Sequence, residues 1–159
     1  MLRLFFDGLC EPKNPGGVAC YGFIVYQVSS NRGAELFEGY GVASEPGPDS
    51  TNNVGEYTGV IKGLEWIQKN TEARNVEVLG DSQVVIRHLT GEYKVRSSRL
   101  MPFHQKTLSL LEHLQWAAKW VPREENTVAD ALSEKAYTEY WMKKTGTVPP
   151  AMRRRGATE

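Results

Sequence analysis

A change in hydrophobic period part-way along the chain constrains its fold more than any other feature. Up to about residue 43, apolar and β-branched residues gather in short runs separated by turn-forming residues, which is the pattern of β-strands. We predict strands over residues 2–6, 18–28 and 34–43, with turns around 12–17 and 29–33. Because short connections join strands of opposite direction, these three strands form an antiparallel meander.

Beyond residue 50 the pattern changes to helices that alternate with strands. Apolar residues repeat there with the spacing of a buried helical face, which predicts a first helix carrying Val60, Ile61, Leu64 and Ile67. The same reasoning predicts a strand over 76–79, a short helix over 83–89, a helix over 100–117 with Leu108, Leu111 and Leu114, a strand over 116–121 and a last helix over 127–143.

This order of elements predicts an α/β fold, because strand–helix–strand connections join parallel strands. We expect one five-stranded mixed sheet, three antiparallel strands and then two parallel ones, flanked by helices. Gly59 and Gly63 lie inside the first helix, where each costs about 1 kcal/mol relative to Ala. Small residues on that face would let the helix lie close to the sheet and would bring Glu56 down to it.

The composition is typical of a globular chain with a single domain: 159 residues, of which 40% are hydrophobic and 24% charged. No apolar run approaches the roughly 18–20 residues that cross a bilayer, and the N-terminus turns polar too soon for a secretory signal. Cys10 and Cys20 fit a reducing compartment, although a single bridge between them stays open. We therefore expect a cytoplasmic protein that does not contact membranes. We also expect it to be a monomer.

Charge is balanced over the whole chain but not along it. The net charge is zero, from 19 Lys and Arg against 19 Asp and Glu. Residues 1–86 carry 6 basic and 11 acidic side chains, whereas residues 87–159 carry 13 basic and 8 acidic ones. This asymmetry fits ordinary solvated charge, and it also fits an anionic metal site beside a cationic surface that binds anions.

Four acidic residues stand where predicted elements meet. Asp7 ends the first strand, Glu56 lies in the first turns of the first helix, Asp81 follows the fourth strand, and Asp130 lies in the first turn of the last helix. Each has a structural explanation by itself. Asp7 could be a turn residue and Glu56 a capping-box acid. Asp81 could cap the next helix, and Asp130 could be a favourable charge at a helix N-terminus.

Taken together, the four acids indicate a metal site. The first and fourth strands are parallel, so Asp7 and Asp81 emerge at the same edge of the sheet, where open α/β sheets bind ligands. Two unit charges 4 Å apart repel by about 4 kcal/mol at an effective dielectric of 20, so a cluster of carboxylates needs cations to neutralise it. Oxygen ligands without a Cys or His cluster favour Mg²⁺ or Mn²⁺ over zinc.

Four motifs in this order resemble those of ribonuclease H type 1: Phe6-Asp7-Gly8 with Asn14-Pro-Gly16, Thr51-Asn-Asn-x-x-Glu56, Gly80-Asp81-Ser82-Gln83, and Asn126-x-x-Ala129-Asp130-x-Leu132-Ser133. Each motif alone is weak, but the four together cover about residues 2–137. The chain looks most like the compact archaeal and bacterial branch, which lacks a separate hybrid-binding domain. The resemblance implies the RNase-H-like fold and a catalytic domain over 1–145. Residues 146–159 show no apolar periodicity, so we expect them to form a flexible basic tail.

The resemblance also implies a metal-dependent endoribonuclease. The metal-binding carboxylates of the family fall on Asp7, Glu56, Asp81 and Asp130, the same set that the topology selects. The implied reaction hydrolyses the RNA strand of an RNA–DNA hybrid and leaves a 5′-phosphate and a 3′-hydroxyl. Two Mg²⁺ or Mn²⁺ ions about 3.5–4 Å apart suit this reaction, because one activates the attacking water and the other stabilises the leaving oxygen.

Recognition of RNA requires groups that read the 2′-hydroxyl across a shallow minor groove. By resemblance, these contacts fall on the side-chain amides of Asn14, Asn52, Asn53 and Gln83, each of which offers both donors and an acceptor. Thr51, with the backbone amides that follow it, resembles the clamp of the family on a DNA-strand phosphate. The structural alternative is that Asn52 and Asn53 only cap the helix.

A basic stretch over residues 87–106 is the best candidate for contacts with phosphates, with ordinary solvated charge as the alternative. It contains one acid, Glu92, against Arg87, Lys94, Arg96, Arg99 and Lys106. Among these, Arg96 and Arg99 are assigned to substrate binding. Whether double-stranded RNA is also a substrate stays open.

The chain departs from the better-known family pattern in the loop before the last helix. Many members carry there a His that is thought to assist product release, whereas this loop reads Pro122-Arg-Glu-Glu-Asn-Thr127. Arg123, Glu124 or Glu125 is the candidate replacement. The remaining histidines, His88, His104 and His113, fall on predicted helices as surface or packing residues.

Two other functions compete with this assignment. One is an RNase-H-like module that binds hybrid without cutting it, which the complete acid set disfavours. The other is a small flavodoxin-like nucleotide binder, which is disfavoured because no glycine-rich loop leads from the first strand into a helix.

Overall fold

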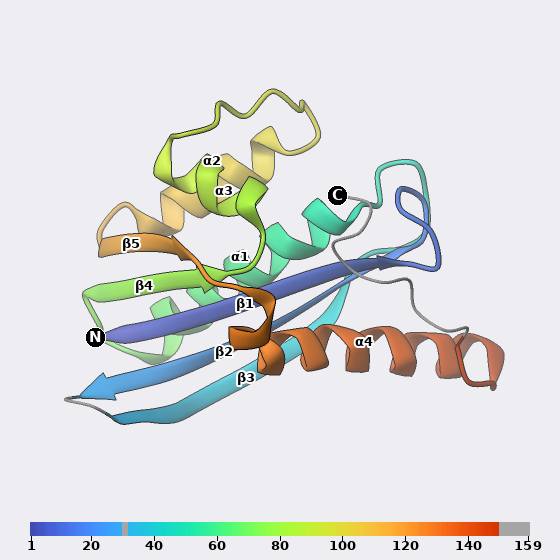
Figure 1. Cartoon of the computed structure of the whole chain (residues 1–159), viewed down its shortest axis with the longest axis horizontal. Coiled ribbons are helices and arrows are strands. Elements are labelled where there is room, and N and C mark those ends of the chain that lie inside the picture. Colours follow the sequence, from blue (N-terminus) through green and yellow to red (C-terminus); the bar gives the residue numbers. More distant parts are fainter. Residues whose placement is uncertain (30–31, 150–159) are drawn as a thin grey trace.

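A single mixed sheet forms the centre of the computed structural model, which describes residues 1–29 and 32–149 (Figure 1). Its strand order is β3-β2-β1-β4-β5. The predicted arrangement of three antiparallel strands followed by two parallel ones is confirmed. The strands are β1 (Leu2–Glu11), β2 (Val18–Ser29), β3 (Arg32–Ser44), β4 (Asn75–Gly80) and β5 (Gln115–Trp120).

Two long helices cover opposite faces of β1–β3, and two shorter ones lie over the β4–β5 side (Figure 1). The helices are α1 (Asn52–Asn70), α2 (Gln83–Thr90), α3 (Met101–Leu111) and α4 (Thr127–Thr145), with a 3₁₀ turn, η1 (Arg123–Glu125), before α4. The main core lies between the sheet and α1–α3, and a smaller cluster around Leu9 and Tyr137 lies under α4.

Two predicted boundaries are wrong. The first strand does not end at Phe6 but continues to Glu11, because β2 keeps pairing with it after β4 has stopped. The helix over 100–117 ends at Leu111, where a turn leads into β5 and Gln115 N–H donates to the Arg74 carbonyl. Leu108 therefore lies on an exposed face, 38% accessible, whereas Leu111 is fully buried.

Glycines let both long helices approach the strands at main-chain distance. A Cβ on Gly8 would collide with the backbone of Gly55 and Glu56 in α1, and a Cβ on Gly22 would lie 2.5 Å from the Ala129 carbonyl oxygen in α4. Gly22 is the β2 partner of Asp7, the residue before Gly8, so the two contacts fall on opposite faces of the sheet. The close packing predicted from Gly59 is also confirmed, since its Cβ would lie 3.2 Å from the Asp7 carbonyl oxygen.

The two cysteines form no disulfide. Cys20 pairs with Leu9 across β1 and β2, while Cys10 is the next residue along β1, so the two thiols point to opposite faces of the sheet. Burial raises the pKa of the Cys20 thiol to about 12. The bridge that the sequence left open is therefore excluded by the register of the strands.

The last helix ends at Thr145 and is followed by its C-cap, Gly146, whose φ of 73° is the left-handed conformation typical of that position. Residues 150–159 of the predicted basic tail, which include the run Arg153-Arg-Arg155, lie outside the described residues. Among the described residues, no helix has both the length and the apolar character required to span a bilayer.

Substitution Gly8→Ala should destabilise the fold by about 2–3 kcal/mol, because the added methyl group meets helix backbone, which cannot rotate away as a side chain could. The matched control is Gly47→Ala, where a Cβ meets no atom within 4 Å and the change should be neutral or stabilising by up to about 1 kcal/mol. Urea unfolding of both variants measures the difference. Equal stability of the two variants would contradict the packing of α1 described above.

Candidate active site

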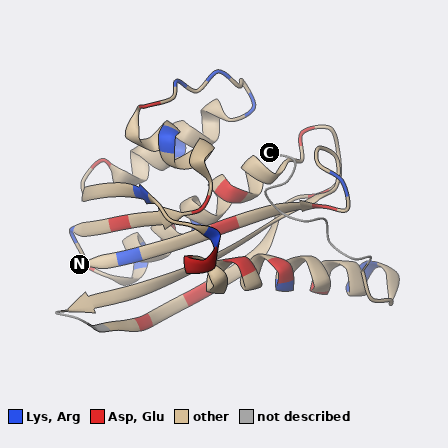
Figure 2. Cartoon of the chain, viewed as in Figure 1, with Lys and Arg blue, Asp and Glu red and all other residues tan. Residues whose placement is uncertain are grey.

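Three carboxylates from three different elements meet at one point of the sheet. Asp7 of β1, Glu56 of α1 and Asp81 after β4 each place a ligand oxygen within 4.8 Å of the others. Asp7 and Glu56 are buried, at 2% and 4% exposure, while Asp81 is half-buried. Figure 2 shows acidic segments of the ribbon converging between the strands and the start of α4.

The place of this cluster follows from the unequal lengths of β1 and β4. The two strands pair up to Phe6 and Gly80, and β4 then stops while β1 continues. Asp7 therefore lies in the middle of its strand. The prediction that it ends the strand, which came from the turn-like Asp7-Gly8 pair, is wrong. Asp7 is nevertheless the first residue of β1 beyond the carboxyl end of β4, so Asp7 and Asp81 lie at the same edge of the sheet, as expected.

Other residues take the capping roles that competed for these acids. Ser82 caps α2, because its hydroxyl accepts a hydrogen bond from Val85 N–H at 3.2 Å. Thr51 caps α1 in the same way, accepting from Val54 N–H at 3.2 Å. Asp81 instead accepts a hydrogen bond at Oδ1 from the side-chain amide of Asn126, at 3.0 Å. A helix-capping role thus explains neither Asp81 nor Asn53.

The fourth predicted ligand, Asp130, does not belong to the group within 4.8 Å. It lies half-buried in the first turn of α4, and its N–H donates to the Asn126 carbonyl at 3.1 Å. Because the start of α4 packs against Gly22, the β2 partner of Asp7, Asp130 stands beside the cluster but outside it.

The donor set suits a hard divalent cation. It consists of carboxylate oxygens alone, and no His or Cys of the described residues joins the group. Three carboxylates this close repel one another, by about 4 kcal/mol for a pair 4 Å apart at an effective dielectric of 20. Binding of Mg²⁺ or Mn²⁺ would replace this repulsion by attraction, so Asp7, Glu56 and Asp81 fit such an ion.

Known proteins share this fold and about a third of this sequence. The model of the reverse transcriptase-like family matches residues 38–136. The bifunctional protein Rv2228c of Mycobacterium tuberculosis is 35% identical over 125 residues, which make up 77% of this chain and 32% of that protein. The structure of RNase H1 from Halobacterium salinarum superposes with a TM-score of 0.74 at 29% identity, covering 87% of this chain and 98% of the other. The chain belongs to the type 1 ribonuclease H family.

Another ribonuclease H1 of similar structure has been solved with nucleic acid. LC11-RNase H1, isolated from compost, superposes with a TM-score of 0.76 at 28% identity over 88% of this chain and 99% of its own, and that structure holds an RNA/DNA hybrid. The present chain spans only about a third of the length of its mycobacterial relatives.

The residues that ribonuclease H resemblance assigns to the minor groove lie at the start of α1 and near it. Asn14 and Asn52 bond reciprocally: the Asn14 amide donates to Asn52 Oδ1 at 2.7 Å, and Asn52 N–H donates to Asn14 Oδ1 at 3.2 Å. Asn53 is half-buried in the same turn, and Gln83 is exposed at the start of α2. The structure thus brings Asn14 and Asn52 together and leaves Gln83 on the surface beside Asp81.

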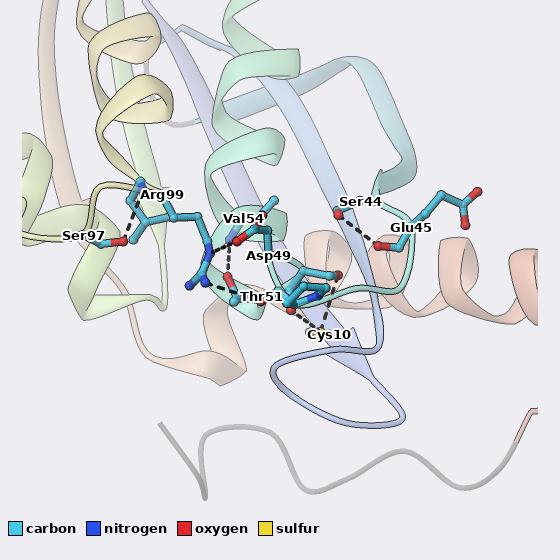
Figure 3. A network of polar contacts seen from close by, with 11 residues as sticks. Cys10, Ser44, Glu45, Asp49, Thr51, Val54, Ser97 and Arg99 are labelled. Carbon is cyan, nitrogen blue, oxygen red and sulfur yellow. Dashed lines mark hydrogen bonds and ion pairs between the residues drawn. The ribbon is translucent and has the colours of Figure 1, made fainter.

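The two arginines assigned to substrate binding differ in their surroundings. Arg99 pairs with Asp49 at 3.2 Å and donates to the Pro48 carbonyl at 3.4 Å, next to the Thr51 cap (Figure 3). Arg96 is exposed, and no acid among the described residues pairs with it. Blue segments along α2 and the connector that follows it show how basic this side of the molecule is (Figure 2).

Two of the three histidines belong to the packing behind the site. Tyr57, the neighbour of Glu56, bonds through its hydroxyl to His88 Nδ1 at 2.8 Å, and the ring of His104 contacts the His88 carbonyl. Burial, and then the charge of His104, lower the pKa of His88, which favours the neutral form of its ring. His88 and His104 lie on helices, as predicted, and take the packing role of the two roles expected for them, but His113 lies in the turn after α3 and not on a helix.

The loop assigned to product release forms the 3₁₀ turn η1. Arg123, Glu124 and Glu125 are exposed, and the turn closes through Asn126 N–H, which donates to the Arg123 carbonyl at 2.9 Å. The role of these residues in product release stays a prediction. Asn126 and Trp120, which flank the loop, have no role in the sequence-based assignment, although both contact Asp81.

Mg²⁺ should raise the melting temperature of the metal-free protein, following RT ln(1 + [L]/Kd). Asp81→Asn should melt no lower than the parent without metal, because it removes repulsion and the new amide oxygen still accepts from Asn126. With Mg²⁺ the variant should gain less than the parent. Thermal melts across a Mg²⁺ titration measure both effects, and an identical gain in parent and variant would contradict the metal-site assignment.

Proposed function

We propose that this chain is a metal-dependent endoribonuclease that hydrolyses the RNA strand of RNA–DNA hybrids and leaves 5′-phosphate and 3′-hydroxyl ends. One observation carries the proposal: carboxylates from β1, α1 and the end of β4 meet within 4.8 Å on a ribonuclease H fold. A structural role does not account for this convergence, since Thr51 and Ser82 already cap the two helices.

Asp7, Glu56 and Asp81 would hold divalent cations, with Asp130 completing the ligand set from the start of α4. Two such cations supply an activated water and stabilise the leaving 3′-oxygen of an in-line displacement. The chain itself supplies position and charge. Because Asp7 and Glu56 are buried, solvent screens their charge less. Gly8 and Gly22 let α1 and α4 pack closely against the sheet beside these acids.

The reciprocal Asn14–Asn52 pair supports a role in reading the RNA strand. Each amide fixes the orientation of the other, so both side chains are pre-organised before the substrate binds. Asn53 and Gln83 would add contacts with 2′-hydroxyl groups from the two sides of the cluster. Thr51, whose hydroxyl already accepts from Val54 N–H, would place the amides at the start of α1 toward a DNA phosphate.

Asp81→Asn should reduce cleavage of labelled RNA–DNA hybrid by orders of magnitude, because the cations that direct in-line attack would be misplaced. Glu35→Gln removes one exposed carboxylate from β3, far from the cluster in the sheet, and should cleave like the parent. The assay is run with Mg²⁺ and with Mn²⁺, and RNA–RNA duplex is the second substrate. Activity of Asp81→Asn within a few-fold of the parent would refute the catalytic assignment.

The same assay separates this function from its alternative, a module that only binds hybrid. A parent protein that retains labelled hybrid in a gel shift but releases no product with either metal would establish the binding module. A parent that cuts hybrid, with 5′-phosphate ends on the products, establishes the endonuclease.

Affinity for hybrid should fall steeply with salt even though the net charge of the chain is zero, by about 0.9 in log K per log salt for each phosphate contact. Replacing both Arg96 and Arg99 with Ala should reduce this slope and leave the choice of the cleaved strand unchanged. Arg74→Ala is the matched control, because Arg74 is exposed and lies just before β4. A flat salt titration of the parent would contradict the position of the basic stretch at the interface.

A further inference from the structure

The segment that joins β5 to α4 holds Asp81 at both its main chain and its side chain. Trp120 Nε1–H donates to the Asp81 carbonyl at 3.2 Å, and Asn126 Nδ2 donates to Asp81 Oδ1 at 3.0 Å. Between them, Val121 N–H donates to the Gly80 carbonyl at 2.9 Å, one step past the end of the β4–β5 ladder. The turn that carries Asp81 is therefore fixed from one side by a single short stretch of chain.

The amide of Asn126 has only one orientation that fits its surroundings. Besides the bond to Asp81, Nδ2 donates to the Phe6 carbonyl at 2.8 Å, and the residue is 98% buried. A carbonyl and an ionised carboxylate only accept hydrogen bonds, so the nitrogen of the amide must face both of them. An alanine could make neither bond, and an aspartate would place a third acceptor against two others.

The side chain of Asn126 does not cap α4, although its position in the chain predicts this role. It is the N-cap of α4, where an Asn side chain normally accepts a bond from the first turn of the helix, but it makes no such bond. Its side chain points to β1 and Asp81 instead. A residue that departs from a local rule in this way is typical of functional sites.

Through its main chain, Asn126 reaches a third acid-bearing segment. Its carbonyl accepts from Asp130 N–H at 3.1 Å, while its amide holds Phe6, the residue before Asp7, and Asp81 itself. One residue thus ties together β1, the turn after β4 and the start of α4. These are three of the four segments that carry the predicted ligands.

Trp120 departs from expectation in another way. The residue is 47% exposed at the end of β5, yet its indole N–H donates to the Asp81 carbonyl. The bond restrains the main chain of Asp81, and the Asn126 bond restrains its carboxylate. Both donors are neutral, so they orient the carboxylate without cancelling the negative charge that a cation would need, as a Lys or Arg in the same place would do.

We propose that Asn126 and Trp120 are positioning residues that hold Asp81 ready to bind a divalent cation. The proposal rests on the proposed function for its catalytic consequence, but not for the binding of metal. Groups that hydrogen-bond to a metal ligand fix its orientation, and their loss typically costs 10–100-fold in metal affinity or activity. Neither residue needs to touch the substrate for this effect.

The test uses Asn126→Ala and Trp120→Phe, with Asn70→Ala as the matched control. Asn70 is exposed at the end of α1, where its amide donates to the Trp66 carbonyl. The readout is the Mg²⁺ concentration that gives half of the metal-induced rise in melting temperature. We expect this midpoint to increase about 10–100-fold for Asn126→Ala and by less for Trp120→Phe, and to stay at the parent value for Asn70→Ala.

Because Asn126 is buried, its variant will melt at a lower temperature even without metal. The comparison between variants therefore uses the rise in melting temperature that Mg²⁺ causes, and not the melting temperature itself. If Asn126→Ala does not fold, the surface variant Trp120→Phe still tests whether the segment controls Asp81. A midpoint within about twofold of the control for a folded variant overturns the proposal for that residue, since a merely structural role lowers stability without changing metal affinity.

Kinetics with hybrid add a second readout. In Asn126→Ala, kcat should fall about 10–100-fold while KM for the hybrid stays within about twofold, because the side chain lies beneath the site and not on its surface. A higher KM with unchanged kcat would contradict positioning of Asp81. A parent that does not cut hybrid, with midpoints that shift as expected, would refute the proposed function and leave the positioning role standing.

Discussion

The close approach of two helices to the middle of the sheet is the constraint on which the rest of this structure depends. Gly8 admits the backbone of α1 on one face, and Gly22 admits that of α4 on the other. Gly8 follows Asp7 in β1, and Gly22 is the β2 partner of Asp7. Both helices therefore approach the sheet next to Asp7, which brings Glu56 and the start of α4 close to this acid. Because these contacts are made by main-chain atoms, they are rigid, and they hold the carboxylates of the site in fixed positions.

This packing brings the negatively charged carboxylates close together, where they repel one another. Hydrogen bonds from neighbouring groups hold the carboxylates in place. Asp7 Oδ1 accepts from Gly8 N–H at 2.9 Å and Asp81 Oδ1 accepts from Asn126, so neutral donors orient the two carboxylates. No basic side chain of the described residues forms an ion pair with Asp81. Elsewhere the chain does neutralise a buried acid: Arg3 and Lys119 both bind Glu77, and the pKa of Glu77 is lowered, mainly by the hydrogen bond from Lys119. The contrast with Asp81 is what a carboxylate reserved for a cation requires.

Hydrophobic period was sufficient to predict the order of strands and helices, because each element buries one face and so repeats with its own spacing. It failed where tertiary packing overrides local preference. Asp7-Gly8 has the composition of a turn, but β2 holds it in a strand; Leu114 continues a helical spacing but leads into β5. The acids of the site were predicted from topology and resemblance together. Asn126 was not assigned a role, because its bonds to Phe6 and Asp81 span 120 and 45 residues, and no sequence spacing reveals them.

The central claim is that Asp7, Glu56 and Asp81 are the ligands of divalent cations on which hybrid cleavage depends. The most direct measurement is a crystal structure of the chain with an uncleavable RNA–DNA hybrid and Mn²⁺, in which anomalous scattering locates the ions. This account predicts anomalous peaks between the three carboxylates and a phosphate of the RNA strand, with Asp130 drawn into the ligand set. Hybrid bound without an anomalous peak at these carboxylates would contradict it.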